Sequence, residues 1–287
     1  SEKAQATVEN LNARVRSWWT MIGVFAISLM VGTGGSLLLF AFISFLALRE
    51  YVSLIPTVSA DHRTLFWSFF VITPLQYWIL YQRWYGVAAI MIPVYAFLFV
   101  PTRLVLARDT TSFLDRAARI HWGLMICVYC ISYAPALLIL EIPGYQGQNA
   151  KLLMFLVIVV QLSDVFQYIW GKLLGKRKIA PAISPNKTWE GFLGGIGTAT
   201  LLGMGLWGLT PFSPLVALGM ALLITLLGFV GGLIMSAIKR DRGVKDFGSS
   251  IEGHGGILDR MDSICFSAPV FFHVTRFIFL TTHGRTP

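Results

Sequence analysis

Long apolar runs recur along most of the 287-residue chain and are separated by short polar connections. A helix of about 20 apolar residues crosses roughly 30 Å of hydrocarbon. Nine such spans are predicted, at residues 19–33, 35–54, 64–81, 84–101, 119–142, 150–170, 189–209, 213–235 and 263–281. The pattern therefore predicts an all-α fold, a polytopic transmembrane helical bundle.

The first residues differ from the rest, because they combine apolar side chains at helical spacing with arginines and end at Trp18 and Trp19. This pattern is typical of a helix that lies in the membrane interface. The predicted parts are an interfacial amphipathic helix at 1–18, N-terminal membrane helices at 19–142, and catalytic C-terminal membrane helices at 150–281 with polar connections at 171–188 and 236–262.

Composition agrees with a membrane protein, since 55% of the residues are hydrophobic and only 13% are charged. The formal charge of +9 could suggest nucleic acid, but the basic residues fall in short connections, where membrane topology explains them. With the N-terminus cytoplasmic and the C-terminus outside, only Arg83, Lys151, Arg276 and Arg285 of the 23 basic residues fall on or near the outer side. The connections 171–188 and 236–262 then share the cytoplasmic face, and no nucleic-acid partner is expected.

The connection 236–262 interleaves basic, acidic and glycine residues, which a topology signal alone does not require. Its glycines around His254 would let the backbone approach a phosphate closely. Asp259 and Asp262 are three apart and would share a helix face, and with Asp246 they could hold a divalent cation through oxygen ligands. Lys239, Arg240, Lys245 and Arg260 supply positive charge for a nucleotide. The alternative is a solvated loop whose carboxylates pair with neighbouring lysines and arginines.

A second polar cluster precedes the connection 171–188. Asp164 lies inside the predicted span 150–170, and an ionisable group within a membrane span is a functional candidate. Further on, Ser184-Pro185-Asn186-Lys187 predicts a turn that offers hydroxyl, amide and ammonium donors at the cytoplasmic surface. An ordinary helix start at Ser184 or Thr188 is the alternative.

At these residues the chain resembles the phosphatidate cytidylyltransferases, also called CDP-diacylglycerol synthases. Their signature has the form Ser-x-x-Lys-Arg, four residues, Lys-Asp, a spacer, and His-Gly-Gly-x-x-Asp-Arg-x-Asp. The residues that match it are Ser236, Lys239, Arg240, Lys245, Asp246, His254, Gly255, Gly256, Asp259, Arg260 and Asp262. A second stretch of the family is matched by Asp164, Tyr168, Gly171, Gly175, Lys176, Ser184, Pro185, Lys187, Thr188, Glu190 and Gly191.

The resemblance implies that CTP and phosphatidate react to give CDP-diacylglycerol and pyrophosphate at the cytoplasmic face. It implies Mg²⁺ as the cofactor, and a second cation stays open as an alternative. It implies a homodimer and an integral, multi-pass protein of a bacterial cytoplasmic (inner) membrane. The catalytic residues that it implies are Lys245, Asp246, His254, Asp259 and Asp262. The residues that it implies for substrate are Lys176, Ser184, Lys187, Ser236, Lys239, Arg240, Gly255, Gly256 and Arg260, and those for metal are Asp164, Asp246 and Asp259. Glu252 is a further candidate metal ligand, although the resemblance itself does not imply it.

The chain departs from the family just before and within the signature. Where the family carries Gly-Asp-Leu-x-Glu-Ser, this chain has Gly232 and Met235 in place of the two carboxylates. Glu252 stands where a small residue is usual, so we expect a rebuilt metal site with Glu252 as a substitute ligand. Two alternatives stay open: a CTP-dependent lipid kinase, and a catalytically degenerate scaffold or transporter. A CDP-alcohol phosphotransferase is disfavoured, because the chain has no Asp-Gly-x-x-Ala-Arg motif.

Overall fold

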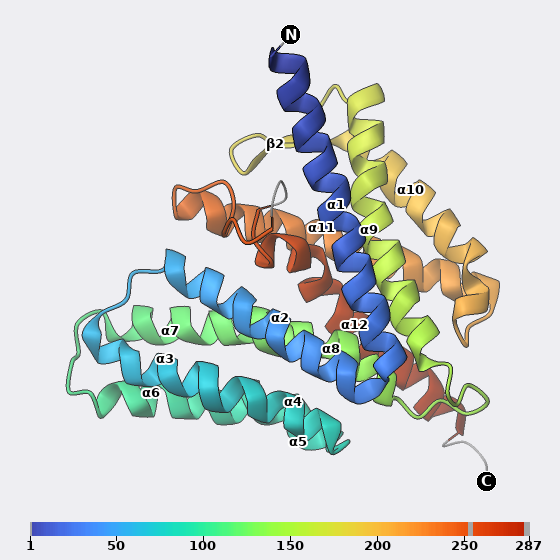
Figure 1. Cartoon of the computed structure of the whole chain (residues 1–287). Helices are drawn as coiled ribbons and strands as arrows, with labels where there is room; N and C mark the ends of the chain where they lie inside the picture. The colour runs from blue at the N-terminus through green and yellow to red at the C-terminus, as the bar shows by residue number, and fades with distance from the viewer. Residues whose placement is uncertain (1, 252–254, 284–287) are drawn as a thin grey trace. The chain divides into compact units, whose positions relative to one another are not determined.

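The computed structural model describes residues 2–251 and 255–283, and nearly all of its regular structure is helical (Figure 1). Within these residues, six helical stretches are long and apolar enough to cross a membrane. They are Thr33–Leu54, Tyr85–Val105, Phe113–Ile139, Asn149–Leu173, Pro214–Asp241 and Leu258–Leu280. The prediction of an all-α protein with transmembrane helices is confirmed, whereas the count of nine spans and the orientation of the termini stay predictions.

The N-terminal part is one helix where two elements were expected. Helix α1 runs from Glu2 to Val31 without interruption, so the predicted interfacial helix and the predicted span 19–33 are continuous. No proline interrupts this stretch, so the backbone has no reason to break at Trp18. The helix ends at Gly32, whose φ of 98° is a conformation that residues with a side chain rarely adopt.

The chain divides into two compact units. Unit 1 comprises Ser1–Ser132 and Asp246–Met261, and unit 2 comprises Tyr133–Lys245 and Asp262–Pro287. Within unit 1 the elements are α1, α2 (Thr33–Leu54), η1 (Ser59–Asp61), α3 (His62–Trp67), η2 (Ser68–Ile72), α4 (Thr73–Tyr81), α5 (Tyr85–Ile90), η3 (Met91–Ala96), α6 (Phe97–Val105), α7 (Phe113–Leu124) and η4 (Met125–Cys130).

Helix α2 is the centre of unit 1, because it contacts α1, α4 and α7 (Figure 1). The hydroxyls of Ser44 on α2 and Tyr77 on α4 lie 2.6 Å apart and share a hydrogen bond. Tyr51 donates a 3.2 Å hydrogen bond to the carbonyl of Arg119, and Gly123 on α7 packs directly against the Tyr51 ring. Polar contacts of this kind stabilise helix packing in lipid, where burial of apolar surface gives little driving force.

A buried ion pair joins two connections of unit 1. Arg116 on α7 and Asp61 on η1 are only 4% and 1% exposed, and Nε of the arginine lies 2.7 Å from Oδ1 of the aspartate. A second nitrogen of Arg116 lies 3.1 Å from Asp109. The other oxygen of Asp61 accepts a 3.0 Å hydrogen bond from the backbone of Val58. The pair thus holds the connections before α3 and before α7.

Unit 2 combines long helices with one short hairpin. The elements are the end of α8 (Ile131–Ala136), η5 (Leu137–Ile139), α9 (Asn149–Leu173), β1 (Lys178–Ala180), β2 (Ser184–Thr188), α10 (Trp189–Gly205), η6 (Trp207–Leu209), α11 (Pro214–Asp241) and the greater part of α12 (Leu258–His283). Helix α10 packs along α9 and α11 (Figure 1). A Cβ placed on Gly195 would lie 2.4 Å from the Gln167 side chain, so a larger residue would separate α10 from α9.

Two expectations about the polar connections are wrong. Residues 184–187 form no turn, because Ser184–Thr188 is a strand antiparallel to Lys178–Ala180 and the chain reverses at 181–183. Strand pairing over these residues satisfies backbone groups that an isolated turn would leave to water. The segment from residue 236 is also no loop at first, since α11 continues to Asp241 before the chain leaves the helix.

Candidate active site

The signature residues of unit 1 lie in a segment that connects to α12, and its described residues, 246–251 and 255–257, are here called the signature loop. The expected residues Glu252 and His254 lie outside the described residues. Asp259 follows on the first turn of α12 and is 7% exposed. Its Oδ2 accepts hydrogen bonds from the backbone N–H of Phe247, at 2.8 Å, and of Gly256, at 2.9 Å. Asp259 therefore fixes two separate points of the loop backbone.

Gly255 brings two of the predicted carboxylates to one place. Its φ of 81° suits glycine, and a Cβ added there would lie 3.0 Å from Oδ2 of Asp259 and 3.4 Å from the carboxyl carbon of Asp246. Asp246 is exposed and Asp259 is buried, so one carboxylate faces solvent while the other supports the loop. Asp246 and Asp259, two of the three carboxylates expected to act together, thus lie close to each other within unit 1.

The loop also contacts a carboxylate that the sequence analysis missed. Glu50, near the end of α2, is 7% exposed and accepts hydrogen bonds from the Ser250 hydroxyl and from the backbone of Ile257 and Leu258. An ionisable residue inside a predicted span is a functional signal. The signal that indicates Asp164 is therefore also present at Glu50, which lies within the predicted span 35–54.

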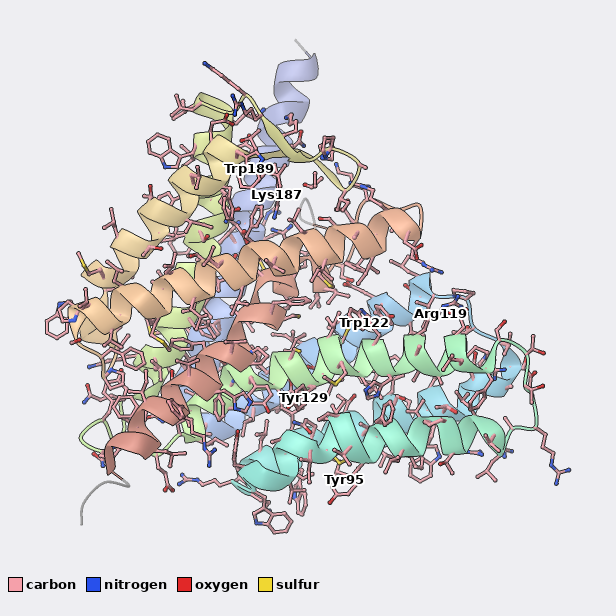
Figure 2. The ribbon with its side chains drawn as sticks, turned by 180° about the vertical axis from the view of Figure 1, so that it is seen from behind. Tyr95, Arg119, Trp122, Tyr129, Lys187 and Trp189 are labelled. Carbon is pink, nitrogen blue, oxygen red and sulfur yellow. The ribbon has the colours of Figure 1, made fainter. Side chains whose placement is uncertain are left out.

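In unit 2, a half-buried lysine and two carboxylates form a second set, here called the Lys187 cluster (Asp164, Lys187, Gly232, Asp262 and Ser263). Lys187 is the penultimate residue of β2, two residues before Trp189 at the start of α10 (Figure 2). Its Nζ lies 4.5 Å from the centre of the Phe229 ring on α11. The Ser263 hydroxyl on α12 donates a 2.9 Å hydrogen bond to Asp164 on α9. Residues distant in the sequence therefore meet around Lys187.

The electrostatic state of Lys187 follows from these surroundings. Burial lowers the pKa of the Lys187 ammonium below its usual value, and the nearby Lys239 acts in the same direction. The carboxylates of Asp164 and Asp262 oppose this shift, because they stabilise the charged form. Because this ammonium is already partly removed from water, it can exchange the two carboxylates for phosphate oxygens without losing much more hydration.

Gly232 leaves the space that Lys187 uses. A Cβ on Gly232 would lie 3.0 Å from Nζ of Lys187 and 3.9 Å from Oδ2 of Asp262. This is the position where the sequence lacks the carboxylate that its family resemblance predicts. Asp164 and Asp262 are the acidic groups whose charge acts on this lysine.

The other predicted substrate residues are more dispersed. Ser236 and Lys239 lie on α11, and the Ser236 hydroxyl donates to the Gly232 carbonyl, 2.6 Å away. Arg240 is exposed and donates to the backbone carbonyls of Ile183 and Val244. Lys245 is exposed beyond the end of α11. In unit 1, Arg260 is half-buried, and its Nε has no hydrogen-bond partner among the described residues.

The hairpin is fixed to α9 and α10 by its own polar residues. Thr188 is the N-cap of α10 and accepts a 3.2 Å hydrogen bond from the backbone of Gly191, as the alternative of a helix start at this residue predicted. Glu190 accepts from the backbone N–H groups of Lys176 and Arg177. Lys176 is exposed, and Ser184 pairs with Ala180 in the hairpin. The predicted residues Lys176 and Ser184 thus lie in the same supported hairpin region as Lys187.

The carboxylates do not gather into one large acidic cluster. Over residues 2–251 and 255–283, no group of three His, Cys, Asp or Glu side chains is arranged to hold a metal ion. Mg²⁺ commonly uses one or two carboxylates together with substrate phosphates, so a carboxylate pair satisfies its needs. Two pairs meet this condition by charge and proximity: Asp164 with Asp262 around Lys187, and Asp246 with Asp259 around Gly255.

Comparison with known proteins agrees with the resemblance. The sequence profile of the Cytidylyltransferase family matches residues 12–278. An uncharacterised protein of Escherichia coli strain K12, YnbB, is 41% identical over 265 residues, which are 92% of this chain and 87% of that protein. A phosphatidate cytidylyltransferase of Bacillus subtilis strain 168 is 35% identical over 189 residues, 65% of this chain and 68% of that protein.

A phosphatidate cytidylyltransferase of Staphylococcus aureus strain COL is 34% identical over 168 residues, 58% of this chain. The match spans 61% of the staphylococcal protein's length. The family profile covers nearly the whole chain, including the signature loop and the Lys187 cluster. From the profile and these relatives, we conclude that the chain belongs to the cytidylyltransferase family.

Proposed function

We propose that this protein transfers the cytidylyl group of CTP to phosphatidate, giving CDP-diacylglycerol and pyrophosphate. Family membership and the phosphatidate cytidylyltransferases among its relatives support this assignment. The structural observation that carries it is the Lys187 cluster, in which a half-buried ammonium lies near two carboxylates. Such a set suits a substrate that brings both phosphate charge and a divalent cation.

The chemistry makes modest demands on the protein. A phosphate monoester such as phosphatidate carries close to two negative charges at neutral pH, since its second pKa is about 6. One of its oxygens attacks the α-phosphorus of CTP, and the bond from that phosphorus to the oxygen bridging to the β-phosphorus breaks. Pyrophosphate leaves with the bonding electrons. The protein must therefore orient the two reactants and stabilise negative charge, and no strong base is needed.

Lys187 is the residue that we propose for the triphosphate. Its ammonium is partly buried and is balanced by Asp164 and Asp262. When phosphate oxygens approach, they can replace these carboxylates as partners at little desolvation cost, because the ammonium is already removed from bulk water. Lys239, Arg240, Lys245 and Arg260 would add positive charge, and Lys176, Ser184, Ser236, Gly255 and Gly256 would supply further donors or room for phosphate.

We propose Mg²⁺ as the cofactor, with Asp164 and Asp262 as its protein ligands. Bound with the substrate phosphates, the cation would neutralise charge on the triphosphate and on the departing pyrophosphate. Asp246 and Asp259 form the other carboxylate pair, and we propose them for a second cation. We propose Glu252 as a further ligand of the cation and His254 as a catalytic residue. Both lie outside the described residues.

The location that fits this activity is a membrane whose lipid supplies phosphatidate. Six helices that are long and apolar enough to cross a membrane support an integral membrane protein. The distribution of basic residues supports a cytoplasmic site with the N-terminus inside and the C-terminus outside, in a bacterial inner membrane. A homodimer is proposed from the family resemblance alone.

The test is incubation of the purified protein with labelled CTP, Mg²⁺ and a panel of lipid phosphates that includes phosphatidate. We expect a CDP-lipid to form with phosphatidate, and Lys187→Met to reduce its rate at least about 100-fold. Release of CDP with phosphorylation of a lipid alcohol would instead identify a lipid kinase. No CTP-dependent product across the panel, in protein shown to be folded, would indicate a scaffold or transporter.

A further inference from the structure

Glu50 is unusual among the carboxylates of unit 1, because it lies on an apolar helix and yet its hydrogen bonds come from the signature loop. Oε1 accepts from the Ser250 hydroxyl at 2.6 Å and from the Ile257 backbone at 3.0 Å. Oε2 accepts from the Leu258 backbone at 2.9 Å. Because both carboxylate oxygens accept hydrogen bonds from the loop, Glu50 is better explained as a residue that holds the loop than as a metal ligand.

Two of these donors belong to the start of α12. The first backbone N–H groups of a helix have no partner within it and carry the positive end of the helix dipole. A carboxylate that accepts from Ile257 and Leu258 satisfies both, with hydrogen bonds strengthened by its charge. Glu50 thus fixes the point at which the signature loop becomes helix, one residue before Asp259.

The loop backbone closes tightly around the same carboxylate. A Cβ on Gly248 would lie 2.9 Å from the Glu50 carboxyl carbon, and one on Gly256 would lie 2.3 Å from Oε2. Neither position accommodates a side chain while Glu50 stays in place. Gly256 also donates its N–H to Asp259. Glu50 and Asp259 therefore determine together the path of the loop on both sides of the residues 252–254.

We propose that Glu50 is a positioning residue of the signature loop: it holds the loop backbone and the first turn of α12 so that Asp246, Gly255 and Asp259 are presented to the nucleotide. The proposal rests on the proposed function, since the loop is assigned to CTP and its cation there. It assigns a task in the reaction to the N-terminal half of the chain, which carries none of the signature residues.

The kinetic test compares Glu50→Gln and Glu50→Ala with the wild type. The amide of glutamine keeps the shape, but its NH₂ group faces a donor, and alanine leaves the N–H groups of Ile257 and Leu258 unpaired. We expect kcat/KM for CTP to fall about tenfold in Glu50→Gln and about 100-fold in Glu50→Ala, mainly through KM. Ser53→Ala is the matched control, because the Ser53 hydroxyl donates to the Glu50 backbone carbonyl within α2, and this variant should keep wild-type kinetics.

A double-mutant cycle separates positioning from a general loss of stability. Gly248→Ala should impair CTP binding while Glu50 is present, because the added methyl group meets the carboxylate. In Glu50→Ala the same methyl group has room, so adding Gly248→Ala should cost little more than Glu50→Ala alone. Strictly additive losses would contradict the proposal.

Hydrogen exchange makes the proposal testable even if no CDP-lipid forms. In Glu50→Ala the amides of Gly256, Ile257 and Leu258 should exchange at least about tenfold faster than in the wild type, while those of α4 are unchanged. Exchange at wild-type rates, together with unchanged KM for CTP, would overturn the role of Glu50. Faster exchange in a protein without cytidylyltransferase activity would refute the proposed function and leave Glu50 as the anchor of the loop.

Discussion

The ammonium of Lys187 lies directly against Gly232, because a Cβ placed on this glycine would stand 3.0 Å from Nζ of the lysine. A carboxylate at that position would pair with the lysine. In this chain Asp164 and Asp262 supply the negative charge that acts on it. Lys187 therefore keeps two acidic neighbours within unit 2, although position 232 carries no carboxylate.

Gly232→Asp should strengthen cation binding. The new carboxylate would lie near Asp262 and Lys187, and the flexible end of the lysine can move away from the added Cβ. We expect the Mg²⁺ concentration for half-maximal activity to fall about threefold to tenfold, since charged oxygen ligands raise affinity for a hard cation. Gly232→Asn has the same shape without the charge, and an equal effect of this control would contradict the explanation.

The affinity for CTP should depend on pH through Lys187. Burial lowers the pKa of its ammonium, and the protonated form is the one that attracts phosphate. CTP affinity should therefore be full below this pKa and decline as pH rises through it, at a lower pH than an ordinary lysine would give. In Lys187→Arg the guanidinium stays charged, so the decline should move to higher pH. An unchanged alkaline limb in this variant would exclude Lys187 as its origin.

The buried pair of Asp61 and Arg116 should matter for stability and not for chemistry. Asp61→Asn removes the negative charge that faces the buried guanidinium of Arg116. We expect this change to lower the free energy of unfolding by about 3–5 kcal/mol. The control is Asp115→Asn, because Asp115 forms an exposed pair with Arg119 and should change stability by less than about 0.5 kcal/mol. Thermal unfolding in detergent measures both, and equal losses would contradict this account.

The hairpin that carries Lys187 should depend on its cap. Thr188→Ala removes the acceptor for the Gly191 N–H at the start of α10, and we expect a loss of about 1 kcal/mol. Thr188→Ser keeps the hydroxyl and should lose less than half as much. The two variants can be compared by unfolding in the same detergent, and a serine variant as unstable as the alanine variant would indicate that the methyl group, and not the cap, is what matters.

Hydropathy predicted most helices well, because a membrane imposes a minimum length on each apolar run. The prediction 213–235 for α11 ended early, since the charged turn from Ser236 to Asp241 is helical without being apolar. The break expected near Trp18 is absent for a related reason: a change from interfacial to apolar side chains does not interrupt backbone hydrogen bonding. Composition locates a span, but the end of a helix depends on caps and turns.

The site was partly predictable from motifs and partly hidden by long sequence separations. Asp246 and Asp259 belong to one charged segment and were expected to act together, whereas the close approach of Gly255 to both was not expected. The turn expected at Ser184 is a strand, because pairing with residues 178–180 outweighed the local preference of Pro185 and Asn186 for turns. Glu50 contacts Leu258, 208 residues away, and no local pattern connects the two.

The most direct test of the central claim uses CTP labelled differently at its α- and γ-phosphorus, with phosphatidate, Mg²⁺ and the purified protein. Cytidylyl transfer predicts the α-label in CDP-diacylglycerol and the γ-label in pyrophosphate, in equal amounts, with both products greatly reduced in Lys187→Met. The γ-label in lipid with the α-label in CDP, or no product from folded protein, would contradict it.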